Sequence, residues 1–355
     1  MTSPVSLSTV PLTHERVLIT TGPRSGLTLI VAVHSTKLGQ ALGGARLWQY
    51  DHWSDALADA LRLSAAMTLK NAAAGLPRGG GKSVVHIPRG VTLDDAQQRD
   101  AMLDLGDAIE SLDGAYMTAE DVGTSAKLMS IVAERTAHVC GLPPEEGGVG
   151  EPADATAAGV YASILSTLDA VYGDRDVAGR HFVISGLGQV GGRLARTLAD
   201  AGARLSVADV VDRSALASEL GADWVEVADA HRISADMFVP CGLGGVLTPQ
   251  VISELRSPAV VGAANNQLAQ RDGAEALRER GILWAPDFVV NAGGVIYLDM
   301  ASEPHADAAK IEARVSRIGE TVTRIIRDAE ARGITTLDAA EGLAAERLGL
   351  APQPA

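Results

Sequence analysis

The sequence H-F-V-I-S-G-L-G-Q-V-G, residues 181–191, joins an apolar run to a glycine pattern. The apolar run predicts a buried strand, and a helix is predicted to start near Gln189. The pattern G-x-G-x-x-G is weak evidence alone, but between a strand and a helix it indicates a dinucleotide site. Its glycines permit a tight turn and a close approach to a pyrophosphate, and the helix start offers that anion N–H groups. The predicted cofactor contacts here are Gly186, Gly188, Gln189, Val190 and Gly191.

Asp209 ends the next predicted strand, residues 205–209. A carboxylate at this position would bond the ribose hydroxyls of NAD and repel the 2′-phosphate of NADP. The sequence therefore favours NAD as the cofactor. The alternative is a glycine turn in an α/β domain that holds no ligand.

Strand and helix patterns alternate toward the C-terminus. Strands are predicted at 181–185, 205–209, 236–239, 259–263 and 282–284, with helical patterns between them. This order is typical of βαβ units and a parallel sheet. After 291–294 an amphipathic helix is predicted, and a last helix at 336–348. The apolar stripe of the amphipathic helix is Ile311, Val315, Ile318, Val322 and Ile325.

Two further stretches, P-C-G-L-G-G at 240–245 and G-A-A-N-N-Q at 262–267, fall at predicted strand ends, where ligands of such sheets bind. Asn265 and Asn266 are predicted to hold a cofactor amide or a substrate amine, with a turn cap as the alternative. Cys241 is interpreted as a small buried residue rather than a redox group, because no partner is evident.

The N-terminal part mixes strand and helix signals. Residues 27–34 predict a strand, and 38–46 a glycine-rich loop that leads into another. Ser54 is predicted to cap a helix over 55–74, with Asp55 and Asp59 near its positive end.

Further along, a helix is predicted at 93–112, a short strand at 116–118 and a helix from Ser125 to about 139. The stretch G-G-V-G-E-P at 147–152 is the predicted domain hinge, because its glycines absorb backbone rotation. A helix of small residues is predicted at 156–172.

The sequence M-T-L-K-N-A-A-A-G-L-P-R-G-G-G-K-S at 67–83 carries two lysines. Lys70 lies in an alanine-rich helical pattern, and Lys82 follows a glycine run and opens a predicted strand at 83–87. Lysine is rare in buried settings unless it is paired or functional. The pair therefore predicts a cleft for a small anionic substrate and a base of adjustable pKa. The alternatives are a solvated helix lysine and a plain turn lysine.

Composition narrows the function classes. A chain of 355 residues is longer than one hydrophobic core usually serves, so two domains are expected. The net charge of −14 argues against a nucleic-acid partner. The two cysteines and eight histidines show no metal-ligand spacing, so no metal is expected. Neither a signal peptide nor an apolar run of membrane-spanning length is evident, so we expect a cytoplasmic protein with no membrane partner.

Seven stretches taken together resemble the leucine, valine, phenylalanine and glutamate dehydrogenase family, from about residue 38 to residue 294. They are L-G-G-A-R (42–46), the stretch 67–83, T-A-E-D-V-G-T (118–124), the stretches 186–191 and 240–245, G-A-A-N-N-Q-L (262–268) and P-D-F-V-V-N-A-G-G-V-I (286–296). The resemblance implies reversible NAD-dependent oxidative deamination of an L-amino acid to a 2-oxo acid and ammonium. We expect an α/β protein with an N-terminal substrate domain, a Rossmann-like dinucleotide-binding domain and a cleft between them.

The domain boundaries follow from the hinge. Residues 1–148 are expected to form the substrate domain, completed by the C-terminal helix 328–355, and residues 149–327 the NAD-binding domain. A homo-oligomer is expected from the resemblance alone.

By the resemblance, Lys70 would bind the substrate carboxylate, Lys82 would be the catalytic lysine and Asp121 its acid–base partner. Hydride transfer from Cα leaves an iminium, which water attacks once a base has taken its proton. A lysine crowded by a second cation in an apolar cleft has a lowered pKa and can be that base. The alternative for Asp121 is a cap of the helix that begins near Ser125.

The resemblance also assigns other contacts. The substrate side would include Gly43, Gly44, Met67 and Asn266. The cofactor side would include Arg46, Thr156, Cys241, Ala263 and Asn265. Arg46 is also a natural anion holder, with a surface strand residue as the alternative.

The chain departs from the family pattern without losing a catalytic group. Ala45 replaces the usual threonine, Leu69 a common tyrosine and Gly242 the usual alanine. The stretch that contains Glu151 lacks the serines often found there. These departures affect the expected specificity, turnover and catabolic role.

Leu42, Ala119, Val295 and Leu298 resemble the side-chain pocket of the leucine enzyme, so leucine or valine is the first expectation. One methylene in an apolar pocket is worth only ~1–3 kcal/mol, so related substrates are poorly excluded. Phenylalanine or tryptophan is the alternative, and glutamate is disfavoured because these motifs hold no extra basic residue. A second alternative is a non-catalytic binding homologue, against which the intact Lys70, Lys82 and Asp121 argue.

Overall fold

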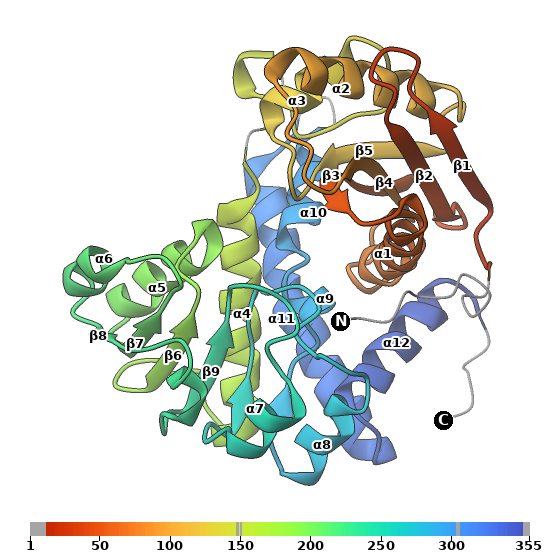
Figure 1. The fold of residues 1–355 in the computed structure, drawn as a ribbon. Helices are drawn as coiled ribbons and strands as arrows, with labels where there is room; N and C mark the ends of the chain where they lie inside the picture. Colours follow the sequence, from red (N-terminus) through yellow and green to blue (C-terminus); the bar gives the residue numbers. More distant parts are fainter. Residues whose placement is uncertain (1–11, 147–148, 150, 303–305, 351–355) are drawn as a thin grey trace. The chain divides into compact units, whose positions relative to one another are not determined.

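The computed structural model describes residues 12–146, 149, 151–302 and 306–350. The described chain forms two compact units, coloured along the sequence in Figure 1. The first unit contains the described residues through Glu151, together with 301–302 and Arg347–Gly349. The second unit contains Pro152–Met300, the described residues from 306 through Glu346, and Leu350. The boundary between Glu151 and Pro152 falls inside the predicted hinge, of which residues 147, 148 and 150 lie outside the described part.

The first unit contains a mixed sheet of five strands in the order β1-β2-β4-β3-β5. The strands are β1 (Arg16–Thr21), β2 (Thr28–Ser35), β3 (Ala41–Tyr50), β4 (Gly79–Pro88) and β5 (Tyr116–Glu120). Its helices are α1 (Trp53–Ala73), α2 (Asp95–Glu110) and α3 (Ala126–Ala133), with a short 3₁₀ turn at Pro144–Glu146. β1, β2 and β4 pair antiparallel, whereas β3 runs parallel to both β4 and β5.

Alternate residues of β2 serve two separate cores. Ile30 and Ala32 pack in a cluster with α1. Leu29, Val31 and Val33 pack in a cluster with α2. Because successive side chains of a strand point to opposite faces, α1 and α2 cover opposite faces of this sheet.

The glycines at 79–81 are the first residues of β4 rather than a turn before it. A Cβ on Gly81 would lie 2.5 Å from the Tyr116 ring, so glycine is required for close packing. The chain turns earlier, at Gly75, whose φ is 66°. The prediction that Lys82 opens the strand is therefore wrong, because Lys82 lies inside β4. Likewise β3 begins at residue 41, within the stretch predicted as loop.

Two helix ends differ from their predicted positions. α1 begins at Trp53 with His52 as its N-cap, so Ser54 lies inside the helix and does not cap it. α3 begins after its cap Ser125, as predicted, but ends at Ala133. It is shorter than predicted because the following chain returns to pair with β5, where the Cys140 N–H donates to the Thr118 carbonyl at 2.8 Å.

The second unit contains a six-stranded sheet in the order β11-β10-β9-β6-β7-β8. All of its pairings are parallel, which confirms the prediction from the alternating pattern. The strands are β6 (His181–Ser185), β7 (Arg204–Ala208), β8 (Asp223–Trp224), β9 (Met237–Pro240), β10 (Ala259–Val260) and β11 (Leu283–Trp284). The helices are α4 (Ala153–Tyr172), α5 (Gln189–Asp200), α6 (Ser214–Glu219), α7 (Pro249–Glu254), α8 (Gly273–Glu279), α9 (Asp287–Val290), α10 (Gly293–Ala301), α11 (Ala308–Arg332) and α12 (Thr336–Arg347), with a 3₁₀ turn at Ala230–Arg232.

Helix α11 packs along α4. The apolar stripe predicted from 311 to 325 is buried, which confirms the amphipathic helix. Small residues let the two helices approach: a Cβ on Gly159 would lie 2.7 Å from Ile318 Cδ1, and one on Gly319 would lie 2.8 Å from the Ala162 carbonyl oxygen.

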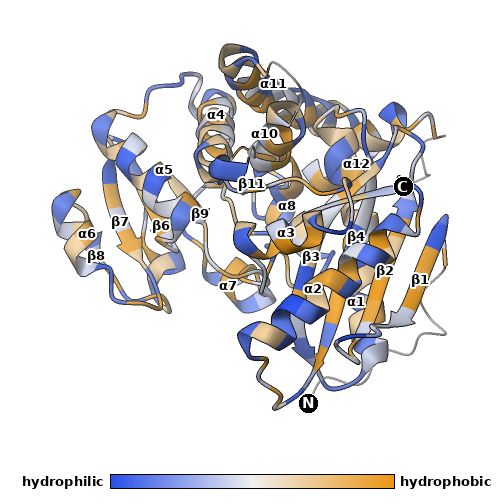
Figure 2. Cartoon of the chain, turned by 90° about the horizontal axis from the view of Figure 1, so that it is seen from above, coloured by the Kyte–Doolittle hydropathy of each residue, from blue (hydrophilic) through white to orange (hydrophobic). Residues whose placement is uncertain are grey.

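The C-terminal helices belong mainly to the second unit. Leu337 of α12 joins the core around β9 and β10, and the Thr336 hydroxyl donates to the Trp284 carbonyl at 2.7 Å. This differs from the expectation that 328–355 completes the first domain: of residues 328–350, which the structure describes, only Arg347–Gly349 group with the first unit. Figure 2 shows hydrophobic residues on strands of both sheets, for example on β2 and β7. Each helix in the described part is too short or too polar to cross a bilayer.

Candidate active site

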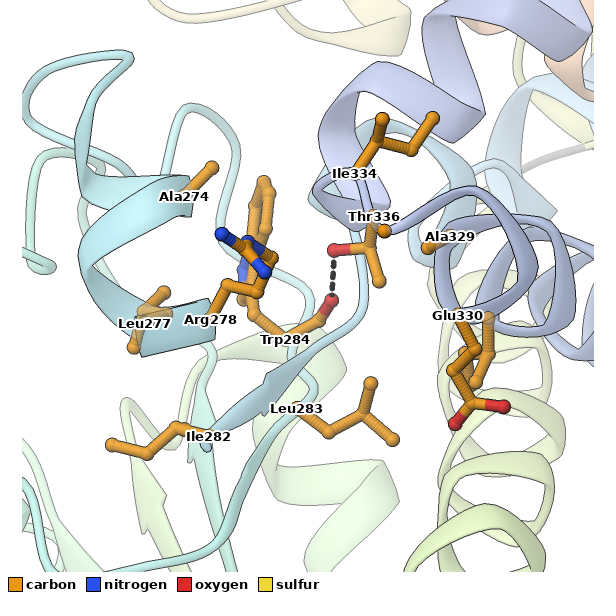
Figure 3. Close-up of a pocket in the computed structure, with 12 residues that line it drawn as sticks. Ala274, Leu277, Arg278, Ile282, Leu283, Trp284, Ala329, Glu330, Ile334 and Thr336 are labelled. Carbon is orange, nitrogen blue, oxygen red and sulfur yellow. Dashed lines mark hydrogen bonds between the residues drawn. The ribbon is translucent and has the colours of Figure 1, made fainter. Parts of the chain in front are cut away.

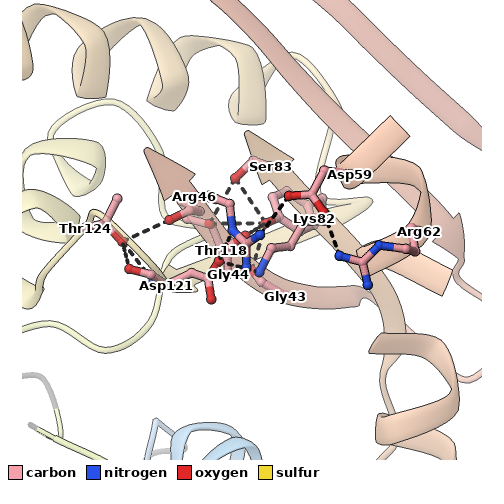
Figure 4. A network of polar contacts seen from close by, with 12 residues as sticks. Gly43, Gly44, Arg46, Asp59, Arg62, Lys82, Ser83, Thr118, Asp121 and Thr124 are labelled. Atoms are coloured by element: carbon pink, nitrogen blue, oxygen red, sulfur yellow. Dashed lines mark hydrogen bonds and ion pairs between the residues drawn. The ribbon is translucent and has the colours of Figure 1, made fainter. Parts of the chain in front are cut away.

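Lys82 and Asp121 come together across strand β3. Because β3 lies between β4 and β5, Lys82 of β4 and Asp121, directly after β5, flank Gly44 of β3. Lys82 Nζ and Asp121 Oδ2 are 2.8 Å apart (Figure 4). A Cβ on Gly44 would lie 2.7 Å from Asp121 Cβ and 3.3 Å from Lys82 Nζ. Glycine at this position therefore allows the pair to form.

The surroundings of the pair change the pKa of both groups. Lys82 is 5% exposed, and burial lowers the pKa of its ammonium, an effect that the Asp121 charge offsets only in part. Burial alone would raise the pKa of Asp121, but the charges of Lys82 and Arg46 outweigh it and hold that pKa below its ordinary value. An ammonium destabilised beside an ionised carboxylate is suited to proton exchange. The interpretation of Lys82 as a plain turn lysine does not fit this setting.

Asp121 does not cap the following helix. Its backbone N–H donates to the Thr124 hydroxyl at 2.8 Å, which fixes the turn after β5. The cap of α3 is Ser125, whose hydroxyl accepts from the Leu128 N–H. The carboxylate of Asp121 is instead directed at Lys82 and Arg46.

Arg46 of β3 contacts two carboxylates. Its Nε donates to Asp121 Oδ2 at 3.0 Å, and its Nη1 donates to Asp59 Oδ2 at 2.7 Å. Its side chain is 20% exposed, so it is not a surface strand residue. The cofactor contact predicted for Arg46 stays a prediction.

Two polar residues that the sequence analysis missed hold the backbone near this pair. Tyr116 is fully buried, and its hydroxyl donates to the Gly43 carbonyl at 2.7 Å. Asn71 is also fully buried and donates from Nδ2 to the Leu42 carbonyl at 3.3 Å. The sequence signal was an asparagine directly after the helical Lys70 and a tyrosine at the start of a short strand.

The other predicted substrate residues of the first unit are placed by α1, β3 and β5. Leu42 and Ala119 are buried at 1% and 5% exposure. Met67 and Lys70 are half-buried on α1, and a Cβ on Gly43 would lie 3.4 Å from Met67 Cγ. Lys70 is therefore not a fully solvated helix lysine.

The glycine loop between β6 and α5 has the geometry that a pyrophosphate requires. Gly186 has a φ of 106°, which only glycine adopts without strain. A Cβ on Gly191 would overlap the Gly186 carbonyl oxygen, whereas a Cβ on Gly188, the N-cap of α5, would meet no atom within 4 Å. The space in front of the helix start is therefore open, and the residues present fit a dinucleotide pyrophosphate.

Asp209 lies directly after β7, beside this loop. Its Oδ2 accepts from the Leu187 N–H at 2.6 Å, and its Oδ1 accepts from the Val211 N–H at 2.8 Å. The carboxylate is thus fixed at the strand end where an adenosine ribose binds in such sheets.

Two family models match most of the chain. Residues 14–138 match the dimerisation domain of Glu/Leu/Phe/Val dehydrogenases, and residues 211–353 match the Glutamate/Leucine/Phenylalanine/Valine dehydrogenase domain. The chain belongs to the Glu/Leu/Phe/Val dehydrogenase family. It is an amino-acid dehydrogenase, an oxidoreductase that depends on a nicotinamide dinucleotide.

Relatives of this dehydrogenase span nearly its whole length. A leucine dehydrogenase of Geobacillus stearothermophilus is 38% identical over 340 residues, which cover 94% of this chain and 90% of that protein. A valine dehydrogenase of Streptomyces coelicolor is 39% identical over 96% of this chain and 94% of its own. The crystal structure of L-tryptophan dehydrogenase from Nostoc punctiforme matches with a TM-score of 0.82 at 33% identity, covering 95% of this chain and 96% of that chain.

The strand ends of the dehydrogenase's second sheet bring the two remaining motifs together. The Gly245 N–H donates to the Asn266 carbonyl at 2.7 Å, and Asn266 has a φ of 52°. Asn291 Nδ2 donates to Asn265 Oδ1 at 2.8 Å and to the Ala263 carbonyl at 3.1 Å. Asn265 and Asn266 are exposed at this edge.

Cys241 follows β9 at the same edge. Burial raises the pKa of its thiol to about 11, so the thiolate needed for redox chemistry is disfavoured. This agrees with the interpretation that Cys241 is not a redox group, but the residue is only partly buried. Gly242, a departure from the family pattern, has room for a methyl group, since a Cβ there would lie 3.6 Å from the nearest atom, the Ser185 carbonyl oxygen.

Helices α4 and α10 approach closely at the glycines of the motif 286–296. A Cβ on Gly293 would overlap the Ala155 carbonyl oxygen, and one on Gly294 would lie 2.7 Å from the Thr156 hydroxyl. The predicted pocket residues Val295 and Leu298 follow on α10, each 8% exposed.

A separate pocket of about 270 Å³ lies among α8, β11, α11 and α12 (Figure 3). Most of its lining is apolar, including Leu277, Ile282 and Trp284. It holds none of the residues that the sequence predicts for the substrate or cofactor, so it is not the candidate active site.

Among the described residues, no group of three or more His, Cys, Asp or Glu is placed to hold a metal ion.

Proposed function

We propose that the chain catalyses the NAD-dependent oxidative deamination of a branched-chain L-amino acid, leucine or valine. The observation that carries the proposal is the Lys82–Asp121 pair, buried beside Gly44 with Arg46 on the carboxylate. Leucine and valine dehydrogenases at 38–39% identity over nearly the whole chain support the substrate class.

The proposed reaction converts an L-amino acid, NAD⁺ and water into a 2-oxo acid, ammonium, NADH and a proton. A nicotinamide dinucleotide held at residues 186–191 and Asp209 would supply the acceptor for the hydride that leaves the substrate Cα. Lys82 in its neutral form takes a proton from the water that attacks the iminium carbon. Asp121 carries the proton that the departing amine requires. The lowered pKa of Lys82 favours this role, because the free amine then exists at a lower pH than for an ordinary lysine.

Substrate and cofactor contacts follow the sequence predictions. Lys70 would hold the substrate carboxylate, with Gly43, Gly44 and Met67 beside it and Asn266 at the amine or nicotinamide. The proposed side-chain contacts are Leu42, Ala119, Val295 and Leu298. The cofactor would be held by Gly186, Gly188, Gln189, Val190, Gly191 and Asp209, with Arg46, Thr156, Cys241, Ala263 and Asn265 as further contacts.

Asp209 supports NAD over NADP. We expect the wild type to use NAD with the higher kcat/KM, and Asp209→Asn to reduce the NAD-to-NADP ratio on the order of tenfold, equivalent to about 1.4 kcal/mol. The amide removes the charge that repels a 2′-phosphate but keeps one acceptor for the Leu187 N–H. Initial rates with each cofactor measure the ratio, and equal use of both by the wild type would refute the assignment.

Leu298 is proposed to limit the substrate side chain. Leu298→Ala should raise kcat/KM for phenylalanine relative to valine on the order of tenfold, because the added space is worth ~1–3 kcal/mol. Leu343→Ala is a matched control, since Leu343 of α12 is similarly buried at 5% exposure and is no predicted pocket residue. A ratio that changes equally in both variants contradicts the pocket role.

Tryptophan or phenylalanine is the second candidate substrate. The 33%-identical tryptophan dehydrogenase supports it. The deciding experiment measures kcat/KM for L-leucine, L-valine, L-phenylalanine and L-tryptophan with NAD. The branched-chain proposal fails if an aromatic substrate has the highest value.

We also propose that the protein is a homo-oligomer in the cytoplasm. The match of residues 14–138 to a dimerisation domain supports self-association. Light scattering coupled to size exclusion measures the mass, and a monomer would contradict the proposal.

A further inference from the structure

Asp59 of α1 has a role that its place near a helix start did not suggest. From the sequence, Asp59 was expected only to be an acidic residue near the positive end of a helix. In the structure its side chain is 15% exposed and faces Arg46 of β3. Asp55, one turn earlier, is the residue that interacts with the helix start, because its carboxylate accepts from the His52 N–H at 3.2 Å.

Both oxygens of Asp59 are engaged. Oδ2 accepts from Arg46 Nη1 and from the Tyr50 hydroxyl, each at 2.7 Å. Oδ1 accepts from Arg62 Nη2, also at 2.7 Å. The carboxylate is therefore held from β3 and from α1 at once, and its orientation is fixed.

Five charged side chains form a continuous series, which we call the ion-pair chain: Arg62, Asp59, Arg46, Asp121 and Lys82 (Figure 4). Charges of opposite sign alternate along it. Arg46 Nε and Lys82 Nζ meet at the same atom, Asp121 Oδ2, at 3.0 and 2.8 Å. The position of that oxygen therefore depends on where the Arg46 guanidinium is held.

We propose that Asp59 is a positioning residue of the reaction, which holds Arg46 from behind so that Arg46 fixes the Asp121 carboxylate against Lys82. The guanidinium is planar and presents its donors in a fixed fork. With Nη1 held by Asp59, Nε can point only toward Asp121. The inference rests on the proposed roles of Lys82 and Asp121.

The ion-pair chain also sets the charge balance around Lys82. Among the charged neighbours of Lys82, the positive charge of Arg46 lowers the pKa of its ammonium, whereas the negative charges of Asp121 and Asp59 raise it. The other titratable groups that face Asp59 are Arg62 and Tyr50, and burial raises the pKa of the Tyr50 hydroxyl well above its ordinary value. Removing Asp59 should therefore lower the pKa of Lys82, and removing Arg46 should raise it.

The test uses Asp59→Asn, Arg46→Gln and the double variant in the full-length protein. Two readouts are measured against pH: kcat/KM with L-leucine, and the rate at which acetic anhydride labels Lys82, with exposed Lys127 as the internal reference. Asp59→Asn should move the Lys82 titration to lower pH, and Arg46→Gln should move it to higher pH. Each should lower kcat on the order of tenfold to a hundredfold, because the reacting groups are misplaced.

The double variant removes one charge of each sign, so its Lys82 titration should return toward the wild type. The double variant also avoids an unpaired buried charge. If Asp59→Asn does not fold, the difference between the Lys82 titrations of the double variant and of Arg46→Gln measures the effect of Asp59. Asp59→Glu keeps the negative charge, so the titration of Lys82 should stay at the wild-type pH. Glu134→Gln is the matched control, because Glu134 pairs with Arg99 on the same unit and is exposed; both readouts should stay unchanged.

If the Lys82 titration of Asp59→Asn or of Arg46→Gln coincides with that of the wild type, or if both shift in the same direction, the role of Asp59 is overturned. The labelling readout needs no turnover. If the wild type deaminates no amino acid, the proposed function fails while the labelling shifts still decide whether Asp59 and Arg46 control Lys82.

Discussion

Replacing Lys82 with alanine is expected to lower kcat roughly a hundredfold to ten-thousandfold, the range that a positioned acid–base group contributes. The lysine is buried in β4, and its Nζ lies 2.8 Å from Asp121 Oδ2, so the variant loses the base and leaves its partner in place. NAD binding should stay near normal, because the proposed cofactor contacts do not include Lys82. Stopped-flow turnover and fluorescence titration of the cofactor measure the two quantities.

Lys127→Ala is the control for this change, since Lys127 is exposed on the same unit. Asp121 keeps its contact with Arg46 in the Lys82 variant, so the remaining carboxylate is not left unpaired. If Lys82→Ala retains more than about a tenth of the wild-type kcat, far above the loss expected of a general base, Lys82 is not that base.

Gly43→Ala is expected to have the largest effect on the fold. A Cβ on Gly43 would overlap the Gly81 carbonyl oxygen, a backbone atom of the neighbouring strand that cannot rotate away. β3 and β4 would have to separate beside Lys82 and Gly44. We expect the free energy of unfolding to fall by about 3 kcal/mol or more, the upper part of the range for overpacked sites, with activity lost in parallel.

Gly188→Ala is the matched control for this substitution. A Cβ there meets no protein atom within 4 Å, so the unfolding free energy should stay close to the wild-type value while NAD binding weakens. Denaturant unfolding followed by circular dichroism compares the two variants. Equal stability of Gly43→Ala and the wild type would contradict the close packing of β3 on β4.

The second sheet could be predicted from the sequence because its strands are short apolar runs separated by helical patterns. Its all-parallel pairing follows from that alternation. The strand order was not predicted, because alternation does not determine which strands are neighbours. Strand β8 was missed, since Asp223–Trp224 is only two residues long. β1 was missed because it is an edge strand without a fully buried residue, so its pattern carries little apolar signal.

The glycine-rich stretches of the first unit were harder to interpret. Residues 41–46 and 79–81 contain several glycines, which usually mark turns and loops. Here they lie in strands, because close neighbours such as Tyr116 leave no space for side chains. A sequence pattern records that a side chain is missing, but it does not show which atom fills the space.

The candidate site could be predicted only in part. Lys82 and Asp121 were identified, and the structure places them in contact. Asp59 was not assigned to the site, because its partner Arg46 lies on a strand and the pairing depends on how α1 packs on the sheet. Tyr116 was interpreted only as a strand residue, since its hydroxyl acts on the Gly43 backbone rather than on a side chain.

The stoichiometry of the reaction with L-leucine and L-valine tests the proposed oxidative deamination. The purified protein is incubated with NAD, and the reduced cofactor, the 2-oxo acid and the ammonium are quantified together, with Lys82→Ala as the impaired control. We expect equal amounts of all three products from the wild type, and about a hundredth of these amounts or less from the variant over the same time. Cofactor reduction without ammonium, or no products from either substrate while phenylalanine or tryptophan is consumed, would contradict it.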